Sequence, residues 1–135
     1  CSTGMMNDAC RREGEMIDIL ERTKHFAIGI IRLYSALPST TVAQVLGKQA
    51  LRSGTSVVTH LREGKRRRSD AEMICKIEGA MQELEETAYW IRLLRDTGIV
   101  QMDRVSGLLK ETNELTAILV NSTKTLKQRK AKKSE

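Results

Sequence analysis

Basic side chains are the groups in this sequence whose type and spacing most clearly predict chemistry. Five of them fall between residues 62 and 68, where a helix is expected to end. They are Arg62, Lys65, Arg66, Arg67 and Arg68. Cations gathered on one surface attract phosphate groups, and this attraction weakens steeply as the salt concentration rises. Cations in the last turn of a helix also stabilise its dipole by about 0.3 to 1 kcal/mol, so a purely structural interpretation stays open.

A second basic run ends the chain. From Asn121 onward there are six basic residues and one acidic residue, so this tail carries +5 of the formal net charge of +6. Its candidate phosphate-binding residues are Lys127, Arg129, Lys130, Lys132 and Lys133. Because the tail and the run at 62–68 have the same sign, together they favour binding to RNA or DNA. In a cyclic oligomer both runs would repeat around a ring and strengthen the field.

The aromatic residues do not indicate recognition of bases. The chain has only Phe26, Tyr34, Tyr89 and Trp90. Each has the spacing of a buried helix residue, whereas proteins that bind single strands stack bases on aromatic rings. Contacts to the backbone or shape of the nucleic acid are therefore expected.

Two glutamates raise the alternative of a magnesium site. Glu83 and Glu86 are three residues apart, as in the sites of all-helical nucleotide pyrophosphohydrolases. Such a site needs further carboxylates on a second helix, and no ExxD or EExxE companion is present. A magnesium-dependent nucleotide hydrolase is therefore the least favoured hypothesis.

Other catalytic arrangements are weaker still. A di-iron bundle needs two Glu-x-x-His pairs, but His25 follows Glu21 by four residues and His60 has no such partner. Both histidines are expected to face solvent or to be hydrogen-bonded. The serines and threonines at 53–59 have no neighbouring base that would activate them as nucleophiles. We expect no enzyme activity, no cofactor and no metal.

Arg52 is expected to form ion pairs that set the register between helices. Acidic partners are available at Glu63, Glu83 and Glu86. Such a pair would lie within one bundle or between subunits.

Composition and periodicity predict an all-α fold. Aromatic residues make up 3% of the 135 residues, charged residues 30%, and there is one proline. Apolar residues recur at helical spacing in four segments, expected at about 8–36, 41–66, 69–96 and 102–128. Joined by short loops, they predict one antiparallel up-and-down four-helix bundle at 8–130, with flexible ends at 1–7 and 131–135.

The segment ends carry recognisable signals. Pro38 ends the first helix, and the hydroxyls at 39–41 can cap the second. Ser69 and Glu72 form a capping box for the third helix, and Gly98 is suited to end it.

Small residues in the second segment predict close helix packing. Gly47 and Gly54 are seven residues apart and share a face. An interior glycine costs a helix about 1 kcal/mol relative to alanine, so a close approach by another helix is the expected compensation.

Self-assembly is also expected. Phe26, Leu33, Trp90 and Leu93 lie outside the narrow apolar stripe that a monomer needs. Their exposure would be costly, which favours a homo-oligomer. The candidate packing or oligomer residues are Gly47, Arg52, Gly54, Glu63, Glu83, Glu86 and Trp90.

A cytoplasmic location is expected. No apolar run approaches the roughly 20 residues that span a bilayer, and the start lacks the pattern of a secretion signal. The three cysteines, Cys1, Cys10 and Cys75, suggest neither a disulfide framework nor a zinc site. Cys75 is expected to be a small core residue, and residues 1–4 resemble a processing remnant.

Three separated motifs resemble one known family. They are GKQALRSGTSVVTHLREG at 47–64, Ser69-x-Ala71-Glu72-Met73-Ile74, and ELEETAYWIRLL at 83–94. In this order, over about residues 24–98, they resemble the bacterial four-helix-bundle family encoded by intervening sequences in 23S ribosomal RNA genes. The segment at 102–128 matches that family only by its pattern.

The resemblance implies a homopentamer in which five bundles form a barrel. Relatives include the accessory variability proteins of diversity-generating retroelements, which are implied to bind a reverse transcriptase and nucleic acid through basic surfaces. Our first hypothesis is therefore a non-enzymatic, homo-oligomeric nucleic-acid-binding or accessory protein. The alternative is an assembly scaffold that binds only protein, and the third hypothesis is the magnesium-dependent hydrolase.

Overall fold

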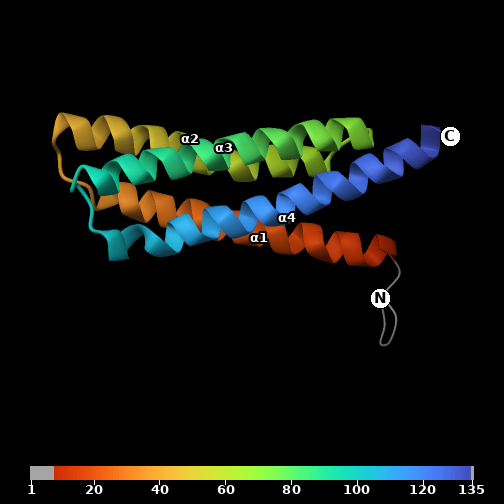
Figure 1. Ribbon diagram of the computed structural model, residues 1–135, viewed down its shortest axis with the longest axis horizontal. Helices are drawn as coiled ribbons and strands as arrows, with labels where there is room; N and C mark the ends of the chain where they lie inside the picture. Colours follow the sequence, from red (N-terminus) through yellow and green to blue (C-terminus); the bar gives the residue numbers. More distant parts are fainter. Residues whose placement is uncertain (1–7, 135) are drawn as a thin grey trace.

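A computed structural model describes the backbone of residues 8–134 and the side chains of residues 18–132. The helices are α1 (Asp8–Ser35), α2 (Thr41–Lys65), α3 (Asp70–Asp96) and α4 (Met102–Ser134), with no strand among the described residues. They run alternately up and down, so the start of α1, the α2–α3 connection and the end of α4 lie at one end of the molecule (Figure 1). The all-α, four-helix prediction is confirmed. The predicted ends at 1–7, including Cys1, lie outside the described residues.

The start of α3 follows the predicted capping box. Ser69 has extended backbone geometry, and its hydroxyl accepts a hydrogen bond from the N–H of Glu72 at 3.2 Å. The Glu72 carboxylate in turn accepts from the N–H of Arg68 at 3.1 Å. Two backbone donors at the helix start are thereby satisfied by local side chains.

The other helix ends also follow local signals. Thr40 caps α2 by accepting from the N–H of Ala43 at 3.4 Å. Gly98 ends α3 with φ = 78°, a left-handed conformation that glycine adopts without steric cost. α4 continues to Ser134, past residue 128 where a helix end was expected. No glycine or proline follows Gly107, and the tail is rich in lysine, arginine, glutamine and alanine, which favour helix.

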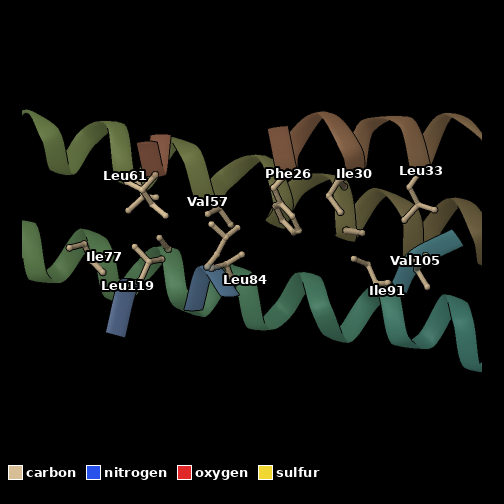
Figure 2. Packing of buried hydrophobic residues seen from close by; sticks show 14 of the residues in the cluster. Phe26, Ile30, Leu33, Val57, Leu61, Ile77, Leu84, Ile91, Val105 and Leu119 are labelled. Atoms are coloured by element: carbon tan, nitrogen blue, oxygen red, sulfur yellow. The ribbon is translucent and has the colours of Figure 1, made fainter. Parts of the chain in front are cut away.

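The core runs along the centre of the bundle and takes apolar side chains from all four helices. Figure 2 shows Ile30, Val57 and Leu84, from three helices, directed into the space between them. The apolar stripe of α3 that steps by threes and fours contains Met81, which is half-buried, and five buried residues. Those buried members are Ile74, Ile77, Leu84, Ala88 and Ile91.

Two residues that suggested assembly belong to this core instead. Phe26 and Leu33 are only 2% and 3% exposed in a single chain. The expectation that they lie outside the buried stripe was wrong, because α1 packs against both α2 and α4 and so buries a wider arc than one stripe. Trp90 and Leu93 are half-buried.

Gly47 and Gly54 of α2 face α1 within the same chain. A Cβ atom on Gly47 would overlap Leu37 Cδ1 and lie 2.8 Å from Tyr34 Cδ2. A Cβ atom on Gly54 would lie 3.0 Å from Cγ1 of Ile30. The close approach therefore joins α1 to α2, and these glycines do not require a second subunit.

A buried pair of hydroxyls joins α2 to α3. The hydroxyl of Thr87 donates to Ser53 Oγ at 2.7 Å, and Ser53 donates to the carbonyl oxygen of Gln49 at 3.0 Å. Both side chains are fully buried. Their polar atoms are satisfied, as burial requires.

Two further observations concern the surface. Cys75 is exposed on α3, so its predicted place in the core was wrong; the apolar stripe of α3 takes its neighbours Ile74 and Ile77 inward instead. Among the described residues, no helix has the length and apolar character needed to cross a bilayer.

Candidate nucleic-acid interface

The first basic run lies at the α2–α3 connection. Arg62 and Lys65 are in the last turn of α2, Arg66 is its C-cap, and Arg67 and Arg68 precede the Ser69 cap of α3. We call these five residues the loop cluster. All five side chains are exposed, and none forms an ion pair with a described residue. The cations are thus free to bind an external anion.

The end of α4 lies beside this connection, where Arg129 forms an ion pair with Asp70. Arg129 Nε donates to Asp70 Oδ2 at 2.8 Å, and Arg129 Nη2 also bonds to Asp70 Oδ1. The two side chains are 28% and 15% exposed. Asp70 is the first residue of α3, next to the loop cluster. A two-pronged, partly buried pair of this kind sets orientation as well as distance.

The tail cations therefore lie at the same end of the molecule as the loop cluster (Figure 1). Lys124 and Lys132 are exposed without an ion pair to a described residue. Lys127 is exposed, with its Nζ 3.9 Å from a carboxylate oxygen of Glu78, and Lys130 is also exposed. The side chain of Lys133 lies outside the described residues. We call residues 124–132 the α4 arm.

Of the predicted nucleic-acid-binding residues, Arg129 has a structural role. Its guanidinium is engaged by Asp70, so it positions the arm. Asp70 was not selected from the sequence, because an acid after a helix cap is already explained by the helix dipole. Its second role, the ion pair with Arg129, depends on a residue 59 positions away in the sequence.

Glu63 has a different partner from the one expected beside Arg52. It accepts a hydrogen bond from Lys76 at 2.6 Å, between α2 and α3. This bond lowers the pKa of Glu63 and raises the pKa of Lys76, so both groups stay charged. The positive charge of Lys76 is therefore balanced by the Glu63 carboxylate, and Lys76 adds little to the basic surface.

Arg52 pairs with the other two predicted acids. Its guanidinium lies 3.5 Å from Glu83 and 2.9 Å from Glu86. These two ion pairs join α2 to α3 within one chain and fit the antiparallel alignment of the two helices. Among the described residues, no group of three histidine, cysteine or acidic side chains is placed to hold a metal ion.

The histidines do not extend the site. His25 is exposed, with its Nε2 3.8 Å from Glu21. His60 is half-buried against Gly79, and its buried Nδ1 has no hydrogen-bond partner, unlike the expectation of a solvated or bonded ring. The packing of α2 against α3 at this glycine places the ring between the helices.

One ion-pair cluster was missed from the sequence. Arg22 of α1 lies 3.0 Å from Glu114 of α4 and also bonds to Glu111. Both acids, Glu111 first, raise the pKa of Arg22. The cluster links α1 and α4, which pack against each other less closely than the other adjacent helices do. No local signal in the sequence predicts a pair separated by most of the chain.

A family model described as the 23S rRNA-intervening sequence protein matches residues 15–121. A similar solved structure is a protein of unknown function from the S23 ribosomal protein family of Bacteroides thetaiotaomicron, with a TM-score of 0.77. The two sequences are 30% identical, and the match covers 82% of this chain and 98% of that chain. No curated protein matches the chain.

Proposed function

This chain belongs to the family of 23S rRNA-intervening sequence proteins, and we propose that it is a non-enzymatic accessory protein that binds RNA or DNA through its basic end. The observation that carries the proposal is the Arg129–Asp70 ion pair. It holds the α4 arm beside the loop cluster, so that two basic runs far apart in the sequence form one surface. A surface of this charge attracts phosphates without needing a catalytic group.

Seven exposed cations at this end have no ion pair with a described residue. They are Arg62, Lys65, Arg66, Arg67, Arg68, Lys124 and Lys132. Their number matters because each phosphate contact releases counterions and adds to affinity at low salt. If about four of them contact phosphates, log K should fall with log salt with a slope of about −3.6 on duplex DNA.

The proposal predicts salt-sensitive binding by the unmodified protein. Labelled 20-nucleotide RNA and DNA, single-stranded and double-stranded, would be titrated with protein in fluorescence anisotropy at 50 to 200 mM salt. The affinity for each probe that binds at 50 mM salt should fall about 100-fold over this range. Absence of binding to every probe at 50 mM salt would refute the proposed function and leave the scaffold alternative.

We propose no enzymatic role. Glu83 and Glu86 are the acids that a magnesium site would use, and both are engaged by Arg52. A carboxylate whose charge is balanced by a guanidinium attracts a further cation less strongly. Magnesium-dependent turnover that disappears in Glu83→Gln would contradict this part of the proposal.

The alternative function, a protein-only assembly scaffold, has its own supporting observation. Val42, Val45 and Tyr89 are 56%, 55% and 54% exposed. Val45 lies two turns before Arg52 on α2, and Tyr89 lies one turn after Glu86 on α3. Because α2 and α3 are antiparallel and paired at Arg52–Glu86, these residues lie toward the end of the molecule opposite the basic end. An apolar surface of this kind suits protein contact.

We propose that copies of the chain associate through this apolar surface. The resemblance to the family implies a homopentamer. Light scattering at micromolar concentration should give a mass several times 15.2 kDa. Val45→Glu should lower that mass, because it places a charge in the interface. The control Val120→Glu makes the same substitution at an exposed valine on α4 and should leave the mass unchanged. A monomeric mass for the unmodified protein would contradict self-association.

A protein partner is proposed on resemblance alone. Accessory variability proteins are implied to bind a reverse transcriptase, and such an enzyme is our candidate partner beyond self and nucleic acid. Copurification of nucleic acid, visible in the ultraviolet absorbance ratio of fresh protein, would support the nucleic-acid role over the scaffold.

A further inference from the structure

We infer that the basic end binds double-stranded nucleic acid through its phosphates, in preference to single strands. This inference rests on the proposed function and names the form of nucleic acid that the surface accepts. It depends on three features of the structure: where the aromatic rings lie, how rigidly the cations are held, and how the two basic segments are joined.

No aromatic ring lies at the basic end. Phe26 is buried in the core, and the hydroxyl of Tyr34 bonds to Gln44 near the opposite end of the bundle. Tyr89 and Trp90 stack edge to face on α3, about 30 Å along the helix from Asp70. These are all the aromatic residues of the chain. Sequence-tolerant binding of single strands draws about 1 to 3 kcal/mol per base from aromatic stacking, and this surface has no ring to supply it.

The cations of the arm are held on a regular helix. α4 is helical throughout the arm, so Lys124 and Lys132 lie about 12 Å apart along its axis. The loop cluster is fixed between the last turn of α2 and the capped start of α3. Cations carried at regular intervals on helical backbone suit a regular array of phosphates. A duplex provides one, with one charge per roughly 1.7 Å of axis.

Counterion release also favours a duplex over a single strand at this surface. Each phosphate contact changes the salt slope by about −0.9 on a DNA duplex and about −0.7 on a single strand. With about four contacts at 50 mM salt, this difference amounts to about tenfold in affinity. The duplex gains this factor because its denser phosphates carry more condensed counterions, which each contact releases.

The comparison that tests the inference uses one sequence in two forms. A 20-base-pair DNA duplex and each of its separated strands would be titrated with the unmodified protein at 50 mM salt, with a matching RNA duplex as a further probe. The duplexes should bind about tenfold more tightly than either strand. Equal or tighter binding of the single strands overturns the inference while the proposed function stands. No binding of any probe rejects the proposed function itself.

A pair of variants tests whether the joined arrangement matters. Asp70→Ala removes the ion-pair partner of Arg129 in the arm, and Asp103→Ala removes one carboxylate from the first turn of α4 at the other end of the molecule. Both raise the net charge by one. If net charge alone controlled affinity, both variants would bind the duplex more tightly.

The inference predicts opposite behaviour for the two variants. Asp70→Ala should bind the duplex about tenfold more weakly, which is the loss of about one phosphate contact at 50 mM salt. Asp103→Ala should bind at least as tightly as the unmodified protein. Circular dichroism would show that both variants remain folded. Tighter duplex binding by Asp70→Ala would show that the docked arm does not form the site.

Discussion

Replacing Arg66, Arg67 and Arg68 by glutamate is expected to weaken nucleic-acid binding by about 3,000-fold at 50 mM salt. These three residues are exposed and adjoin the docked arm. Loss of about three phosphate contacts removes about 3.5 units of log K at this salt concentration, and the new carboxylates repel phosphate as well. Fluorescence anisotropy with the duplex probe would measure the change. Loss of the favourable dipole interaction at the C-cap of α2 should cost about 1 kcal/mol of stability, and circular dichroism would show that the variant remains folded.

A matched control separates local contact from total charge. Lys48, Arg92 and Arg104 are exposed cations toward the opposite end of α2, α3 and α4. Their replacement by glutamate changes the net charge by the same amount. Because screening limits exposed charges to about 10 Å at 0.1 M salt, this control should retain most of the binding. Equal losses in the two triple variants would show that binding has no defined place on the molecule.

The second large effect is expected in stability, at the close approach of α1 and α2. Gly54→Leu should lower the free energy of unfolding by about 3 kcal/mol, which corresponds to about 10 °C in melting temperature. The new Cβ would meet Cβ and Cγ1 of Ile30, a fully buried, branched side chain close to its own backbone. Relief would require the two helices to separate and expose the core. Thermal and urea unfolding followed by circular dichroism would measure the loss.

Gly107→Leu is the control for this substitution. Gly107 lies on the exposed face of α4, and a Cβ atom there would meet nothing within 4 Å. The same replacement should stabilise this variant by up to about 1 kcal/mol, because it removes the penalty of a glycine within a helix. If Gly54→Leu unfolded at the same denaturant concentration as the unmodified protein, the packing role of Gly54 would be refuted.

Sequence patterns predicted the helices well because their signals are local. Ser69 and Glu72 are three residues apart, and both cap α3 as expected. Gly98 adopts the left-handed backbone that its place after a helix suggested. The end of α4 was placed too early, because fraying was inferred from charge although the residues themselves favour helix.

The candidate site was predicted less completely. Its cations were identified, since a run of lysine and arginine is visible without a structure. The ion pair between Asp70 and Arg129 was not predicted. The two residues are separated by 59 positions, and only the packing of α4 on α3 brings them together. The same limit explains why Lys76, rather than Arg52, was found beside Glu63.

Local spacing in the sequence determined that this protein is four antiparallel helices of one family, with small residues on one helix and cations in two runs. The tertiary structure alone decided that Phe26 and Leu33 are core residues and that the glycines pack within one chain. It also decided that the two basic runs meet. The physical reason is that a helix's caps and periodicity depend on residues one turn apart, whereas its rotation and register depend on side chains packed from every neighbouring helix.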